Sequence, residues 1–377
     1  MKETNEDKIY VKIGDEVNDN YSDDDLYNIT SWGADLSFRE LIARYEEGEL
    51  VKPEIQRNYI WDKSEASRFI ESILMGLPVP SIFLAKKGDQ HLIVDGYQRI
   101  MTIFDFKRGI FSKDESVFKL ANSNKINLKW RGKAFSQLNQ NEQRRILTTT
   151  IHAIIFEQRK PENSDTSLYQ VFERINTSGR SLLPQEIRNC IYQGNLNSSL
   201  IKLNNNEKWR FLYGLEKPDS RMRDIEFILR FFTFSNLNFE SIPTKQISLK
   251  RTLNLFMGDK ENNRPEFVKK IKEEFDITIS FIYEHLGKNA FHNISKKEDS
   301  RYVEKFHPTI FDSVMIATLY ALKKNSNLRR DNLESQRLKL LQNEDYILYI
   351  SKRTTNIEHI KGRISLALKY LYGMEYE

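Results

Sequence analysis

The spacing of apolar residues predicts two amphipathic helices near the start of the chain, with an extended segment between them. Residues 37–48 begin with a capping box, continue as an apolar stripe and end in a glycine. Residues 64–75 repeat the helical spacing and are followed by Gly76, a residue type that commonly ends helices. Residues 51–61 lie between them and contain Pro53, which disfavours a helix there.

A pair of strands and a third helix are predicted next. Residues 81–86 and 90–95 are apolar stretches of strand length, separated by the three-residue loop 87–89. A helix over residues 97–107 follows the second strand at once and ends at Gly109. The predicted order is therefore helix, extended segment, helix, hairpin, helix.

The rest of the chain predicts one further strand, at residues 151–156, and then mainly helices. Helical periodicity is clearest at residues 167–175, 184–192, 224–234, 265–286 and 310–323. We therefore predict an α+β fold in which a small α/β domain precedes an α-helical domain. The expected division is a flexible acidic segment at 1–30, the α/β domain at 31–195 and the helical domain at 196–377.

Composition argues against a membrane or secreted protein. Hydrophobic residues make up 39% of the 377 residues, yet no apolar run approaches the roughly 20 residues that span a bilayer. The acidic N-terminus does not resemble a signal peptide, and the single cysteine, Cys190, cannot form an internal disulfide. We expect a cytoplasmic protein with no membrane partner.

The distribution of charge leaves two interpretations open. Residues 1–30 hold nine acidic and three basic side chains, a net charge of −6, so the remainder carries +11 within a total of +5. A basic body with an acidic tail is typical of a protein that binds a polyanion and whose tail competes for the same surface. The other interpretation is ordinary solvation of a large surface.

The junction of the predicted second strand and third helix, Asp95 to Arg99, is the clearest candidate site. A strand that enters a helix through Gly96 presents backbone N–H groups and the positive end of the helix dipole to an anion. Gly96 would let the backbone approach a phosphate closely, and Gln98 and Arg99 would reach its oxygens. Asp95 would either cap the helix or hold Mg²⁺. The alternative is purely structural, with Asp95 as the cap and Arg99 in a surface ion pair.

A second Gln-Arg pair, Gln56 and Arg57, lies in the extended segment. Two such pairs on neighbouring elements could hold one phosphate chain from two sides, although Gln and Arg are common surface residues.

Several sequence blocks together resemble the N-terminal domain of the GmrSD restriction proteins. They are residues 53–61 (PEIQRNYIW), 69–80 (FIESILMGLPVP), 95–99 (DGYQR), 172–179 (FERINTSG) and 183–188 (LPQEIR). The resemblance covers roughly residues 31–195, and a looser similarity continues through residues 221–230.

The resemblance implies a ParB/sulfiredoxin-like fold with a nucleotide-binding strand-to-helix turn. It implies binding or hydrolysis of a nucleoside triphosphate that licenses attack on modified or foreign DNA. Carried over to this chain, the pocket comprises Asp95, Gly96, Gln98 and Arg99, with Gln56 and Arg57 opposite.

Three further residues each have two alternative roles. Tyr97 stands where the family usually has a glutamine, and it would stack on a base or sugar or, as we expect, pack in the core. That change puts hydrolysis in more doubt than binding. Arg174 and Asn176 would either reach the ligand or serve as a salt-bridge partner and a helix cap.

Other chemistry-bearing residues are expected to be structural. None of the six histidines forms a His-x-x-x-His pair, so we expect no His-Asn-His nuclease domain. His307 is expected at a helix entry, and Cys190 and residues 231–234 in the core. The basic stretch 323–339 would either meet a phosphate backbone or be a solvated helix face.

The leading hypothesis is a Mg²⁺-dependent NTPase that acts on or senses DNA in bacterial anti-phage restriction. Asp95, Gln98 and Arg99 would be its catalytic residues, and Asp95 would hold the metal. One alternative is a non-catalytic, nucleotide-gated adaptor that binds DNA, a partner nuclease or a second copy of the chain. A third is a DNA nuclease that uses the same pocket.

Overall fold

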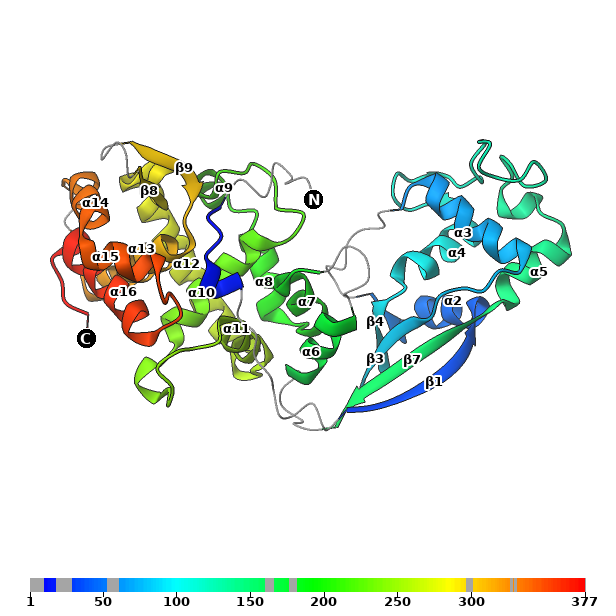
Figure 1. Ribbon diagram of the computed structural model, residues 1–377, viewed down its shortest axis with the longest axis horizontal. Helices are drawn as coiled ribbons and strands as arrows, with labels where there is room; N and C mark the ends of the chain where they lie inside the picture. The colour runs from blue at the N-terminus through cyan, green and yellow to red at the C-terminus, as the bar shows by residue number, and fades with distance from the viewer. Residues whose placement is uncertain are drawn as a thin grey trace. The chain divides into compact units, whose positions relative to one another are not determined.

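Figure 1 shows the computed structural model, in which residues 10–17, 29–52, 61–159, 166–175, 182–295, 301–325, 328 and 331–376 are described. The chain divides into two compact units. Asp24–Leu182 with Glu186–Ile191 form the first, here called the N-terminal unit. Met1–Asp23, Leu183–Gln185 and Tyr192–Glu377 form the second, the C-terminal unit.

A mixed five-stranded sheet organises the N-terminal unit, with strand order β1-β7-β3-β4-β2. Its strands are β1 (Ile29–Ser37), β2 (Leu50–Val51), β3 (Ile82–Lys87), β4 (Gln90–Asp95) and β7 (Thr150–Gln158). β3 and β4 form the predicted antiparallel hairpin, while β3 runs parallel to β7 and β2 parallel to β4. β1 pairs antiparallel with β7 along its whole length. The sheet together with the helices makes the fold α+β, as predicted.

The helices of the N-terminal unit begin and end close to the predicted positions, except that the helix at Gln140–Thr148 was not predicted. They are α2 (Phe38–Glu46), α3 (Lys63–Met75), α4 (Tyr97–Arg108), α5 (Gln140–Thr148) and α6 (Thr166–Ile175), with α7 (Pro184–Ile191) following along the chain. The Ser37 hydroxyl accepts from the Glu40 N–H at 3.2 Å and so caps α2. Gly76 ends α3 in the left-handed conformation, as Gly109 ends α4.

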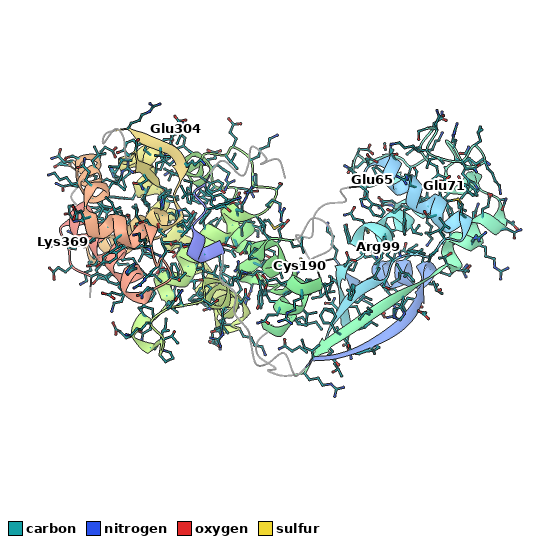
Figure 2. All side chains as sticks on the ribbon, viewed as in Figure 1. Glu65, Glu71, Arg99, Cys190, Glu304 and Lys369 are labelled. Carbon is teal, nitrogen blue, oxygen red and sulfur yellow. The ribbon has the colours of Figure 1, made fainter. Side chains whose placement is uncertain are left out.

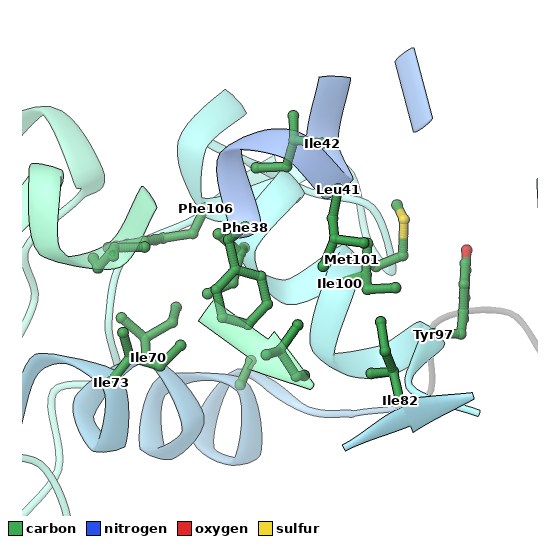
Figure 3. Close-up of a cluster of buried hydrophobic side chains, with 14 of the residues drawn as sticks. Phe38, Leu41, Ile42, Ile70, Ile73, Ile82, Tyr97, Ile100, Met101 and Phe106 are labelled. Carbon is green, nitrogen blue, oxygen red and sulfur yellow. The ribbon is translucent and has the colours of Figure 1, made fainter. Parts of the chain in front are cut away.

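An apolar core joins these helices to the sheet (Figure 3). Phe38 and Leu41 of α2, Ile70 of α3 and Ile100 of α4 are each fully buried in it. Between α4 and α5 the chain forms short strands β5 (Ile110–Phe111) and β6 (Ser116–Val117), irregular turns and the short 3-10 helix η3 (Phe135–Gln137). In Figure 1 this connection runs beside α3 and α5, away from β1 and β7.

The C-terminal unit is mainly helical, as predicted. Its α-helices are α1 (Gly14–Val17), α8 (Asn195–Leu203), α9 (Glu207–Tyr213), α10 (Arg223–Asn236), α11 (Leu249–Gly258), α12 (Pro265–His285), α13 (Pro308–Lys324), α14 (Leu333–Gln342), α15 (Glu344–Ser351) and α16 (Ile357–Tyr372). Three 3-10 helices accompany them: η4 (Phe239–Ser241), η5 (Glu261–Asn263) and η6 (Gly287–Asn289). A short antiparallel hairpin, β8 (His292–Ile294) and β9 (Tyr302–Phe306), was not predicted because β8 is too short to show an alternating pattern.

The interior of the C-terminal unit confirms two structural expectations. Phe231 and Phe232 of α10 are fully buried, so these aromatics belong to the core. His307 stands at the entry to α13, where burial lowers the pKa of its imidazole to about 4. It is therefore a neutral, structural histidine at physiological pH.

Residues 10–17 depart from the flexible behaviour expected of segment 1–30, because they pack on the C-terminal unit. The Val11 N–H donates to the Phe306 carbonyl at 2.9 Å, and Ile13 is buried. Glu16 of α1 forms an ion pair with the buried Arg230 at 2.7 Å. Apolar contact and a charge-matched partner fix this stretch although segment 1–30 as a whole is polar.

Candidate functional site

The candidate site begins where β4 passes into α4. Gly96 connects them with φ of 102° and ψ of 2°, in a left-handed region that a non-glycine residue rarely adopts. A Cβ atom on Gly96 would lie 2.2 Å from Cγ2 of Ile82 in β3. The left-handed turn and the close packing on β3 are therefore sufficient reasons for a glycine at position 96. The predicted reason, close approach of a phosphate to the backbone, is not needed to explain it.

Asp95 and Arg99 bond to each other across this turn. The Nη2 group of Arg99 donates to Oδ2 of Asp95 at 2.6 Å. Asp95 does not cap α4, since the N-cap residue is Gly96, which has no side chain to do so. The prediction that Asp95 caps the helix is therefore wrong, and the ion pair of Arg99 is present.

Arg99 also fastens α4 to the segment that leads into β3. Its Nη1 group donates to the carbonyl oxygen of Pro80 at 2.9 Å and to that of Ser81. The Arg99 side chain is only 16% exposed, whereas that of Asp95 is 42% exposed. Arg99, labelled in Figure 2, thus holds the turn in place, while Asp95 keeps a solvent-facing carboxylate.

Tyr97 and Gln98 connect the first turn of α4 to Lys52 and Trp61. The Trp61 N–H donates to Oε1 of Gln98 at 3.2 Å. The ammonium nitrogen of Lys52 lies 4.9 Å from the centre of the Tyr97 ring. Lys52 and Trp61 immediately flank the segment that carries Gln56 and Arg57 in the sequence, and both lie beside this turn.

Tyr97 packs in the core, as expected, with 7% of its surface exposed (Figure 3). Burial of Lys52 against it lowers the pKa of the Lys52 ammonium. A half-buried lysine beside the first turn of a helix is a candidate phosphate ligand that the sequence reasoning missed. Its position next to Pro53, at the start of the Gln56-Arg57 segment, was the available signal.

The remaining predicted site residues are not brought to this turn by the described contacts. Arg174 is exposed in the last turn of α6, a helix that packs through Phe172 on Phe156 of β7. β3 separates β7 from β4 in the sheet. Gln56, Arg57 and Asn176 lie outside the described residues.

The donor set constrains what the turn could hold. Among the described residues, no group of three or more His, Cys, Asp or Glu side chains is arranged to hold a metal ion. One carboxylate oxygen of Asp95 is engaged with Arg99. Asp95 therefore fits Mg²⁺ only as a single protein ligand shared with phosphate oxygens, which is a common arrangement for this cation.

Cys190 is not part of any reactive site. Its thiol is 1% exposed, and burial raises the thiol pKa to about 12, so it stays protonated and unreactive. The expectation that Cys190 is a core residue is confirmed.

Residues 38–193, from α2 through α7, match the family model described as GmrSD restriction endonuclease, N-terminal domain. This chain carries a GmrSD N-terminal domain. The match contains both the turn at Asp95–Arg99 and the segment 53–60, and it suggests a role in restriction and defence against phage. Neither a curated protein nor a solved structure matches the sequence. No helix in the described part of the chain is both long and apolar enough to cross a membrane.

Proposed function

We propose that the GmrSD N-terminal domain of this chain binds a nucleoside triphosphate at the start of α4, in a ParB/sulfiredoxin-like fold. The chain would use this binding, with Mg²⁺-dependent hydrolysis, to act on DNA during restriction of phage. The observation that carries the proposal is that Lys52 and Trp61, which flank the segment 53–60 in the sequence, both contact the first turn of α4.

The charges at this turn suit a polyphosphate. The first turn of α4 has no acidic side chain, and Gly96 offers no capping group that would compete for its backbone N–H groups. Lys52 adds a half-buried ammonium, and Arg57 would add a guanidinium from the segment that follows Lys52 in the sequence. A cation in a half-buried site interacts more strongly with phosphate than one in bulk water.

Each residue of the turn has a distinct role in this proposal. Arg99 positions the turn through its bonds to Asp95 and to the Pro80 and Ser81 carbonyls. Gln98 holds Trp61 by accepting a hydrogen bond from its backbone N–H. Asp95, with its exposed carboxylate, would hold Mg²⁺, which supplies neutralisation of phosphate charge when it is bound.

Calorimetric titration of the full chain with ATP, GTP, CTP and UTP, each with Mg²⁺, tests the proposal and names the base. Arg57→Ala and Lys52→Met should each weaken the preferred nucleotide by tenfold or more, about 1.4 kcal/mol, because each removes a charge-assisted contact. Arg44→Ala is the matched control. This substitution also removes one positive charge, but from α2, where Arg44 forms an ion pair with Glu40 at 2.7 Å.

The control variant should bind with unchanged affinity. Equal affinity in the wild type, Arg57→Ala and Lys52→Met would reject this site, as would failure of all four nucleotides to bind.

A second candidate function, a non-catalytic nucleotide-gated adaptor, is favoured by the engagement of Arg99. This residue makes its described bonds to Asp95 and to two backbone carbonyls, so it acts as a brace rather than as a mobile catalytic group. Measurement of phosphate release under conditions where calorimetry shows saturation separates the two candidates. Sustained release that Asp95→Asn abolishes supports an NTPase, whereas saturation without release supports the adaptor.

A further inference from the structure

The positive charge of this protein is concentrated in one segment of the N-terminal unit, residues 107–145, here called the basic arm. It comprises the end of α4, the connection through β5, β6 and η3, and most of α5. The arm holds ten Lys and Arg against three Asp and Glu side chains, a net charge of +7. Because the whole chain has a net charge of +5, all other residues together carry −2.

The arm is irregular in secondary structure, but specific hydrogen bonds hold it in place. The Ala121 N–H donates to the Ser67 hydroxyl at 2.8 Å. The Asn127 N–H donates to a carboxylate oxygen of Glu71, which Figure 2 labels on α3, at 2.6 Å. The Trp130 indole N–H donates to Glu142 of α5 at 2.9 Å. The arm is thus fastened to both α3 and α5.

Several cations of the arm have no acidic partner in the part of the chain that the structure describes. Lys119, Lys125 and Arg144 are exposed and Lys133 is half-buried, and none of them forms an ion pair there. Backbone hydrogen bonds between Leu120 and the 132–133 segment place Lys119 next to Lys133.

Other basic side chains of the arm are already engaged. Lys129 forms an ion pair with Glu142 at 2.8 Å, and Arg145 packs on Gly76 at the end of α3. Lysines and arginines that lack acidic partners can bind phosphates without first breaking an ion pair, and the fixed backbone that carries them does not have to be ordered on binding.

We propose that the basic arm is the surface through which this chain binds the phosphate backbone of double-stranded DNA. The proposal rests on the proposed function, which makes DNA the target, and it assigns the contact to Lys119, Lys125, Lys133 and Arg144. Exposed apolar side chains among these cations, Val117 and Leu128, would contact the sugars between phosphates.

The basic stretch of the C-terminal unit, which the sequence offered for this role, is less suitable. Arg337 is fully buried and donates to the backbone carbonyls of Ala290 and His292, so it cannot meet a phosphate backbone. Lys323 forms an ion pair with Glu274 at 2.8 Å. The alternative in which Arg337 meets a phosphate backbone is therefore wrong.

Fluorescence anisotropy of the full chain with a labelled 20-base-pair duplex, measured over a series of salt concentrations, tests the proposal. The test variant carries Lys119→Gln, Lys125→Gln, Lys133→Gln and Arg144→Gln. The matched control carries Lys269→Gln, Lys339→Gln, Lys352→Gln and Lys369→Gln, four exposed lysines of the C-terminal unit. Both variants remove four positive charges, so a difference between them reports where the charges lie.

The test variant should bind DNA at least tenfold more weakly than the wild type at about 0.1 M salt. A plot of log affinity against log salt concentration should also become less steep, its slope falling in magnitude by roughly 3 to 4, because each of the four lost phosphate contacts contributes about 0.9. The control variant should keep most of the affinity. Thermal unfolding of both variants checks that they fold, and the substituted side chains are exposed or half-buried.

Equal loss of affinity in the two variants would overturn the proposal, and so would the absence of DNA binding by the wild type. Binding to anionic vesicles or single-stranded RNA, but not to the duplex, would also overturn it. The nucleotide titration gives an independent readout, because the test variant leaves Lys52 and Arg57 intact. If the wild type binds the duplex as expected but binds none of the four nucleotides, the nucleotide site is rejected and the DNA surface is retained.

Discussion

Single residues set the geometry of the candidate turn, and Gly96 is the most constrained of them. Its positive φ and the 2.2 Å approach of a Cβ to Ile82 are two separate reasons for glycine. Arg99 is constrained in another way, since it bonds to Asp95 and to residues 80–81 at once. The turn is therefore held by packing and hydrogen bonds before any ligand arrives.

Gly96→Ala should destabilise the N-terminal unit by about 2–4 kcal/mol, because backbone strain and a steric clash with Ile82 add together. Gly109→Ala is a close control, since Gly109 also has positive φ but its added Cβ would meet no atom within 4 Å. The control should lose only about 1 kcal/mol. Urea unfolding followed by far-UV circular dichroism measures both, and equal losses would contradict the role assigned to Ile82.

Cys190 should resist alkylation in the folded protein, because burial raises its thiol pKa to about 12 and leaves 1% of its surface exposed. We expect iodoacetamide at pH 8 to label Cys190 only when denaturant is added, as measured by mass spectrometry. Rapid labelling of the native protein would show that α7 opens readily and would contradict its place in the core.

At the scale of elements, the sequence predicted what local chemistry determines. The glycine ends of α3 and α4, the Ser37 cap of α2 and the β3–β4 hairpin follow from residue types that act within a few positions. The insertion of β7 between β1 and β3 does not, because pairing over more than fifty residues leaves no local pattern.

The partners of Arg99 show the same limit within the site. Its ion pair with Asp95 is local, and it was one of the two alternatives for this residue. Its bonds to Pro80 and Ser81 join positions 18 and 19 residues apart. Lys52 belongs to no sequence motif, and only the fold brings its ammonium onto the Tyr97 ring. Its role therefore could not be predicted from local sequence alone.

The junction of the basic arm with α5 should be sensitive to acid through Glu142. Burial would raise the pKa of this carboxyl, but hydrogen bonds from Lys129, Trp130 and Asn139 outweigh it and lower the pKa to about 2. A carboxyl whose pKa falls on folding stabilises the folded protein fully when the pH is above the pKa of that carboxyl in the unfolded chain, which is about 4.5. That stabilisation is lost as the pH falls from about 4.5 to about 2.

Glu142→Gln should therefore reduce stability near neutral pH by about 1–3 kcal/mol and flatten the dependence of stability on pH between 4.5 and 2. Urea unfolding monitored by tryptophan fluorescence at several pH values gives both quantities. An unchanged pH profile in the variant would show that Glu142 does not hold the arm.

At the scale of the whole molecule, the N-terminal segment belongs to the C-terminal unit through a buried charge network. Arg230 bonds to Glu16 of α1 and to Asp312 of α13, and Arg363 of α16 also reaches Asp312. The two positive charges of these arginines and the two negative charges of these carboxylates cancel within the network. Removal of Glu16 would leave this buried network with an excess positive charge.

Glu16→Gln should lower the stability of the C-terminal unit by about 3 kcal/mol and release residues 10–17 to proteolysis. Glu240→Gln breaks an exposed ion pair with Lys361, so it should change stability by less than about 1 kcal/mol and serves as the control. Thermal unfolding and limited proteolysis with mass spectrometry measure the two effects. Equal behaviour of the two variants would contradict the anchoring role of Glu16.

Lysine footprinting with and without the nucleotide tests the location of the proposed nucleotide site most directly. Acetylation of Lys52, read by mass spectrometry, should fall at least severalfold when the preferred triphosphate and Mg²⁺ saturate the protein, because phosphate would cover its ammonium. Lys369, an exposed lysine of the C-terminal unit labelled in Figure 2, should react at the same rate in both states. Unchanged acetylation of Lys52 under conditions where calorimetry shows saturation would place the nucleotide elsewhere and contradict the account.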